Sequence, residues 1–101
     1  ELFIANDVAF TGSIYTGLKD CSGKQRYEKL ATGTEIVQIV NGDATGTVRI
    51  AMGSSRDDAI NNLGLNVLAG ETAYLSVSSS DKGYAWDGDT ITVTINQGVL
   101  A

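Results

Sequence analysis

The amino-acid sequence predicts an all-β fold, a single antiparallel β-sandwich or jelly roll of about seven to eight short strands. Apolar residues recur at every second position in several segments, which is the period of a half-buried strand. Glycine, asparagine and aspartate cluster between these segments, where tight turns need them. The chain has 101 residues, of which 43% are hydrophobic and 19% charged, so it can build one core and one domain.

Three segments, 47–52, 73–78 and 90–95, alternate between apolar and more polar residues. Their apolar faces need a common interior, so we expect these faces to form the core. The predicted core residues are Val48, Ile50, Leu75, Val77, Ile91, Val93 and Ile95. The threonines of the last segment, Thr90, Thr92 and Thr94, are expected on the opposite face.

Segment 35–40 carries apolar residues on both faces, which indicates a central strand or a strand covered on both sides. The glycines and the asparagine of 41–46 predict a hairpin-like connection of about six residues to the strand at 47–52. A further strand is expected at 65–68, before a turn at 69–71.

Glycines break up the first third of the chain, where we expect only short strands near 3–5 and 13–15. At most one short helix is expected, near 55–63, where Ser55 and Asp58 form a capping pair. An irregular loop is the alternative for this segment.

The composition excludes several classes of function. The chain has no histidine, which removes Ser-His-Asp and Cys-His catalytic groups and histidine metal ligands. A net charge of −5 is unsuited to gripping phosphate backbones, so no nucleic-acid partner is expected. No apolar run approaches the ~18–20 residues of a membrane span, so no membrane partner is expected either. We therefore predict no enzymatic activity and no cofactor.

Two groups of residues are candidates for chemistry. Cys21 lies between Lys19 and Lys24, and nearby cations favour a thiolate, but the chain has no histidine to serve as base, so an ordinary loop cysteine is favoured. Asp87 and Asp89 flank a glycine and have the spacing of half a calcium loop. The rest of an EF-hand spacing is missing, so a glycine-centred turn without metal is favoured.

Three aromatic residues are candidates for contact with a partner. Tyr74 is expected on the outward face of its strand, and Tyr84 and Trp86 are expected to flank a loop at 81–86. Exposed aromatic rings stack on sugars or anchor protein interfaces. The alternative for Trp86 is a plug over the end of the core.

The basic stretch Lys19–Lys29 is the other candidate surface, suited to an acidic partner, and a solvated loop is its alternative. The apolar ends of the chain, Leu2–Ile4 and Val99–Ala101, favour strand addition to a neighbouring subunit. The alternative is that both ends pair as edge strands within one monomer. The predicted interface residues are Leu2, Phe3, Lys24, Arg26, Tyr74, Tyr84 and Trp86.

Residues 27–95 resemble a small β-sandwich of virion surface proteins of tailed bacteriophages. The resemblance rests on three sequence motifs. The first, Tyr27–Thr34, leads into the sandwich, the second, Asn66–Thr72, contains a turn, and the third, Gly88–Val93, opens the last strand. It implies a β-sandwich over 27–101. Residues 1–26 have no counterpart and are expected to form an N-terminal arm or an extra strand pair packed on the domain.

The resemblance implies a capsid decoration (cement) protein or a fibre-base domain that does no chemistry. Its partners are then the major capsid protein or another virion subunit, and further copies of itself, commonly as trimers or dimers, of which we favour the trimer. Its place is the virion surface, after synthesis in the host cytoplasm. The competing interpretations are a carbohydrate-binding or adhesin module and, less favoured, an enzyme fragment that works with carboxylates alone.

Overall fold

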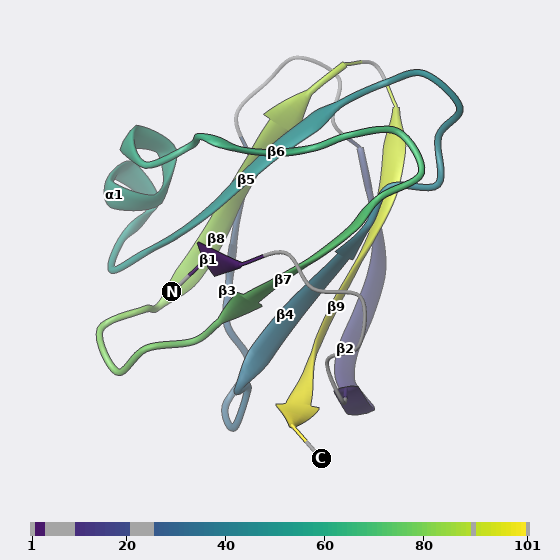
Figure 1. Cartoon of the computed structure of the whole chain (residues 1–101). Helices are drawn as coiled ribbons and strands as arrows, with labels where there is room; N and C mark the ends of the chain where they lie inside the picture. Colours follow the sequence, from purple (N-terminus) through teal and green to yellow (C-terminus); the bar gives the residue numbers. More distant parts are fainter. Residues whose placement is uncertain (1, 4–9, 21–25, 90, 101) are drawn as a thin grey trace.

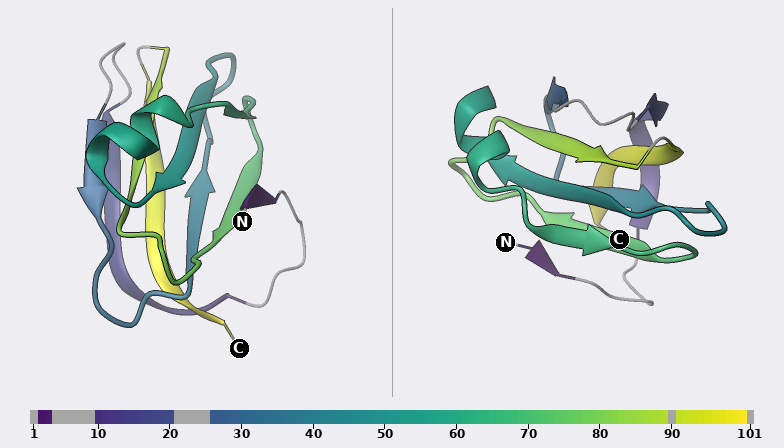
Figure 2. Two further views of the ribbon diagram at one scale, coloured as in Figure 1. Left: turned by 90° about the vertical axis from the view of Figure 1, so that its left-hand side faces the viewer. Right: turned by 90° about the horizontal axis from the view of Figure 1, so that it is seen from above.

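The computed structural model describes residues 2–3, 10–20, 26–89 and 91–100, and within them two antiparallel sheets form a sandwich (Figures 1 and 2). One sheet has the strand order β1-β7-β4-β9-β2 and the other the order β3-β8-β5-β6. The predicted all-β sandwich is therefore confirmed. The strands are β1 (Leu2–Phe3), β2 (Phe10–Asp20), β3 (Arg26–Lys29), β4 (Ile36–Val40), β5 (Val48–Gly53), β6 (Leu65–Val67), β7 (Thr72–Ser76), β8 (Gly83–Gly88) and β9 (Thr92–Leu100).

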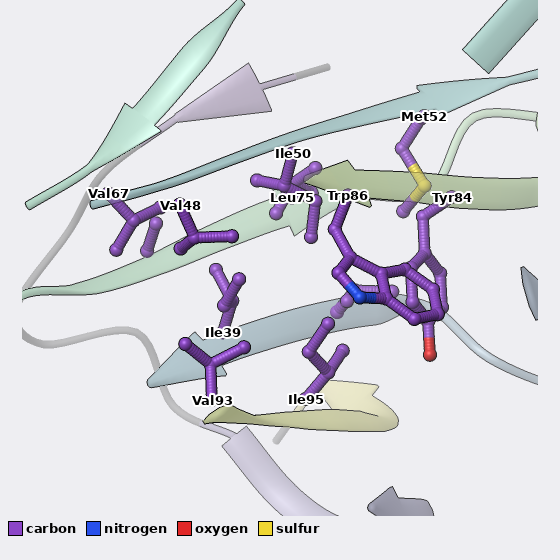
Figure 3. Packing of buried hydrophobic residues seen from close by; sticks show 12 residues of the cluster. Ile39, Val48, Ile50, Met52, Val67, Leu75, Tyr84, Trp86, Val93 and Ile95 are labelled. Carbon is purple, nitrogen blue, oxygen red and sulfur yellow. The ribbon is translucent and has the colours of Figure 1, made fainter. Parts of the chain in front are cut away.

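The core lies between the two sheets, and the sequence located most of it (Figure 3). Full burial of one aliphatic side chain, such as a valine, leucine or isoleucine, stabilises the fold by roughly 1.5–3 kcal/mol. Val77 and Ile91 are only partly buried and pack against the margin of the core. Thr92 is exposed to solvent, as expected. Thr90 lies outside the described residues. The predicted residues that are buried in the core are Val48, Ile50, Leu75, Val93 and Ile95.

Strand β4 is central, as its two-sided apolar pattern predicted. It pairs with β7 on one side and with β9 on the other. Val37 and Ile39 enter the core, and Ile36, which alternates with them, is also fully buried. Such burial on both faces explains why the strand has almost no polar positions.

The connection after β4 is not the predicted hairpin. β4 belongs to the five-stranded sheet and β5 to the four-stranded sheet, so residues 41–47 cross from one layer to the other. The segment is instead ordered by side chains that accept from nearby backbone N–H groups, Asn41 from Asp43 and Asp43 from Thr45 and Gly46. A turn signal does not by itself say whether the next strand pairs with the previous one, and this inference from the sequence was wrong.

Helix α1 (Arg56–Asn61) is the short helix that the sequence predicted. The Ser55 hydroxyl caps it by accepting a hydrogen bond of 3.2 Å from the Asp58 N–H. The helix packs on the outer face of the four-stranded sheet at Gly53, where an added Cβ would collide with the Ala59 backbone. This close approach explains a glycine at the end of β5.

Both ends of the described chain pair within the monomer. β1 pairs with β7, and β9 lies between β4 and β2. The prediction that Leu2–Ile4 and Val99–Ala101 are left over for strand addition is therefore wrong for the described residues of these segments. Within residues 1–26, β1 and β2 lie at opposite edges of the five-stranded sheet, and β2 is much longer than the strand expected near 13–15.

Candidate functional site

The predicted aromatic interface is not on the surface. Tyr84 is fully buried and Trp86 is 4% exposed, and their ring centroids lie 5.6 Å apart within the core (Figure 3). The expected loop at 81–86 is wrong, because Gly83–Gly88 forms strand β8. The core interpretation of Trp86 is confirmed, and neither ring is available for stacking on a sugar.

Tyr74 alternates with the core residues of β7, so it lies on the outward face of its strand as predicted. It is only 7% exposed, however, so its ring is not available to a partner as expected. Gln38 donates a hydrogen bond of 3.0 Å to its hydroxyl, and Asn96 donates one of 2.8 Å to Gln38. The strand register places the three residues in one row across β7, β4 and β9. They form a polar ladder of uncharged side chains that ties three strands together.

Of the remaining predicted interface residues, those that the structure describes lie in different sheets. Leu2 and Phe3 pair in register with Leu75 and Tyr74 at one edge of the five-stranded sheet. Arg26 is half-buried at the edge of the other sheet. Lys24 and Cys21 lie outside the described residues.

The two aspartates considered for calcium have protein partners instead. The carboxylate of Asp87 accepts two hydrogen bonds from the Arg49 guanidinium, at 2.8 and 2.5 Å, and this ion pair raises the pKa of Arg49. Asp89 accepts a hydrogen bond of 2.8 Å from the Thr47 N–H. Within 26–89 and 91–99, no group of three cysteines or carboxylates is placed to hold a metal.

A buried polar network that the sequence did not reveal joins the two sheets beside β3. Gln97 of β9 is 1% exposed, and its carbonyl accepts a hydrogen bond of 2.7 Å from the Ala31 N–H. Its amide group donates to the Tyr84 hydroxyl at 3.3 Å and to the Lys29 carbonyl at 3.3 Å. The Tyr84 hydroxyl in turn donates to Glu28 at 2.9 Å. Each polar group has a structural partner, so the network positions strands rather than a reaction.

A second buried amide lies where the chain crosses between the sheets. Asn41 is fully buried, and its side-chain amide donates to the carbonyls of Gly46 and Val67, each at 2.9 Å. Its side-chain oxygen accepts a hydrogen bond of 3.1 Å from the Asp43 N–H. The sequence predicted a turn here, but not that the asparagine is the buried centre of it.

The edges of the sheets differ greatly in length. Three of the four described edge strands have two, four and three residues, namely β1, β3 and β6. The fourth, β2, has 11 residues and forms one side of the five-stranded sheet in Figure 1. Its pairing with β9 is irregular between Thr11 and Tyr15 and regular from Tyr15 to Asp20. We call the side of Tyr15–Asp20 that faces away from β9 the β2 edge, and it is the candidate interface.

Comparisons of the chain with family models, with curated proteins and with solved structures found no match. The resemblance to phage virion proteins therefore stays a prediction. In the part of the chain that the structure describes, no helix is long and apolar enough to cross a membrane.

Proposed function

We propose that this protein is a non-enzymatic structural component of a tailed-phage virion, a capsid decoration protein that binds an assembled shell. Support comes from the resemblance of residues 27–95 to virion surface sandwiches and from the confirmed sandwich fold. The charged groups at 49, 87 and 89 are engaged in structural contacts, as are the buried amides. The carbohydrate-binding alternative loses support, because the three aromatic residues on which it rested are buried.

The observation that carries the proposal is the β2 edge. An edge strand presents alternate N–H and C=O groups, and an extended segment of a partner adds to it by backbone hydrogen bonds. The other three described edge strands are short and offer few backbone groups to a partner. Two register irregularities distort the first half of β2. The regular run Tyr15–Asp20 is thus the part of the described edges best suited to strand addition.

A contact of this size is weak when it is made once. Specific interfaces generally bury at least about 1,000 Å² in total, more than a six-residue edge supplies alone. A shell repeats its subunits many times, and an oligomeric decoration protein binds several of them at once, so the effective affinity rises by about 10²–10⁴. The homo-oligomer that we expect, with a trimer favoured, fits this requirement for multivalent binding.

The direct test is co-sedimentation with empty shells assembled from the major capsid protein encoded in the same genome. Saturable binding that raises the melting temperature of the shell is the expected result. Shells that neither bind the protein nor gain stability would overturn the proposal.

Two proline variants locate the contact. In an antiparallel strand, successive N–H groups point to opposite sides, so of Thr16→Pro and Gly17→Pro one removes an N–H from the β2 edge and the other an N–H bonded to β9. The variant that keeps the melting temperature should lose shell binding, while alanine at the same position should retain it. Full binding by that folded proline variant would show that the β2 edge is not the contact.

Light scattering of the isolated protein tests the expected homo-oligomer. A strict monomer at high concentration that also fails to bind shells would favour the carbohydrate-binding alternative. Glycan-array binding would then be the next measurement.

A further inference from the structure

Asn41 precedes Gly42, and this is the one Asn-Gly pair in the sequence. Asparagine before glycine is prone to deamidation, because no side chain shields the backbone nitrogen that attacks. The Gly42 nitrogen bonds to the Asn41 Cγ, the bond from Cγ to Nδ2 breaks, and ammonia leaves with the proton of the Gly42 N–H. Water then opens the cyclic imide to aspartate or isoaspartate.

The fold holds the reacting amide in place. Both hydrogens of the Asn41 amide are used in bonds of 2.9 Å to the Gly46 and Val67 carbonyls, and its oxygen accepts from the Asp43 N–H. The side chain is fully buried. To reach the attacking nitrogen, Asn41 would have to leave all three partners, and this requires local opening of the crossing between the sheets.

Gly42 itself offers no protection. It is exposed, it has no positive φ, and nothing lies within 4 Å of the place where a Cβ would be. No side chain from elsewhere in the fold therefore crowds this position. Protection comes from the hydrogen bonds of the Asn41 amide, so it disappears when they break.

The products do not fit the folded structure. An aspartate at position 41 would turn carboxylate oxygens toward the Gly46 and Val67 carbonyls in a site without exposure to solvent, where only a donor is satisfied. An isoaspartate would lengthen the main chain where the Asn41 N–H donates to Glu71 and its carbonyl accepts from Gly70. Either product would oppose refolding.

We propose that Asn41–Gly42 is a modification site gated by folding: it is inert in the folded protein, deamidates when this crossing opens, and then prevents return to the native state. Copies that unfold for long become permanently inactive, whereas folded copies persist. This inference goes beyond the proposed function and does not depend on it.

The experiment incubates the full chain at 37 °C with and without urea and follows the peptide that contains Asn41 by mass spectrometry. Deamidation at Asn41 should be at least about 100-fold slower in the folded protein, because only the minor open population reacts. Asn62 and Asn66, which are followed by Leu63 and Val67 and are exposed, serve as internal references for slow sites. Equal rates with and without urea would overturn the gating.

Gly42→Ala is the matched control, because its Cβ has open space in the fold and hinders attack on Asn41. In urea it should deamidate more slowly than the wild type. After ageing in urea and dilution, the refolded fraction of the wild type should fall in step with modification at Asn41, and that of Gly42→Ala should be largely retained. Full refolding of deamidated wild-type chains would refute the proposed block.

Discussion

Asn41 and Gln97 are both buried primary amides that connect the two sheets, yet their partners differ in kind. All three partners of the Asn41 side chain are backbone groups. Gln97 also bonds to backbone groups, but it shares its amide hydrogens with the side chains of Tyr84 and Glu28. The exposed fractions of the two are nearly the same, 0% and 1%, so burial alone does not distinguish them.

The comparison shows how a polar residue fixes a crossing between layers. Backbone partners are held by the strands and turns on either side and have little freedom to find a substitute. Side-chain partners can rotate, and Glu28 is only half-buried, so water can replace a lost bond there. We therefore expect the Asn41 site to tolerate change poorly and the Gln97 site to tolerate it better.

The largest effect is expected for Asn41→Ala. It leaves two carbonyls and one N–H without their partner, and each unsatisfied buried group costs about 1–3 kcal/mol, so the loss is roughly 4 kcal/mol in total. Urea unfolding followed by far-UV circular dichroism measures it. The exposed Asn66 provides the control, since Asn66→Ala should change the free energy of unfolding by less than about 0.5 kcal/mol. A loss below about 1 kcal/mol for Asn41→Ala would show that water satisfies the site.

Gln97→Ala should lower the free energy of unfolding by less, about 2 kcal/mol, because part of its hydrogen-bond network can rearrange or take up water. Gln97→Met, which keeps the volume and removes the hydrogen bonds, separates the polar contribution from packing. The measurement is the same urea unfolding. If Gln97→Ala lowered the free energy of unfolding as much as Asn41→Ala, backbone and side-chain partners would not differ in how well they tolerate the loss of the amide.

Tyr84→Phe should cost about 1 kcal/mol, because it removes one hydroxyl and leaves the ring packed beside Trp86. A double-mutant cycle with Gln97→Met tests whether the two side chains act as one network. The two losses should add to more than the loss of the double variant, with a coupling of about 0.5 kcal/mol or more. Strict additivity would mean that the bond of 3.3 Å between them contributes little.

The sequence predicted what local periodicity controls. The alternation at 47–52, 73–78 and 90–95 located most of the core, and the two-sided pattern of β4 located the middle of a sheet. Both follow from the period of two that a strand imposes on its side chains. The helix was also predictable, because its cap acts within a few residues.

The features that the sequence did not reveal depend on contacts far apart in the chain. The sequence predicts a loop at 81–86, where β8 begins, but small residues there have close neighbours from elsewhere in the chain. An added Cβ at Gly83 would collide with the Tyr27 side chain of β3, and α1 packs on β8. Gln97 is buried because Ala31, 66 residues away, donates to it. The aromatic part of the predicted interface failed for the same reason, since whether an aromatic ring is exposed depends on which sheet covers it.

The smallest expected effect concerns Asp43, which sits next to the Asn41 site and whose carboxylate bonds to local backbone. One of its carboxylate oxygens accepts from the Gly46 N–H at 2.7 Å and from the Thr45 N–H at 3.0 Å. These two bonds, that from Gly46 first, hold the pKa of Asp43 below its ordinary value of 3.8. Asp43→Asn keeps an acceptor oxygen in the same place, so it should remove only the contribution of the negative charge.

Because the folded-state pKa of Asp43 is lower than the unfolded one, its charge stabilises the fold above 3.8 and this contribution is lost as the pH falls through the folded-state pKa. The difference in free energy of unfolding between wild type and Asp43→Asn should thus be constant from neutral pH down to about 3.8 and shrink below it. Urea unfolding of both proteins across this range measures the difference. A gap that widens on acidification would mean that the carboxylate is less stable in the fold than in the open chain. The turn would then owe more of its stability to Asn41, and the contrast with Gln97 would be sharper still.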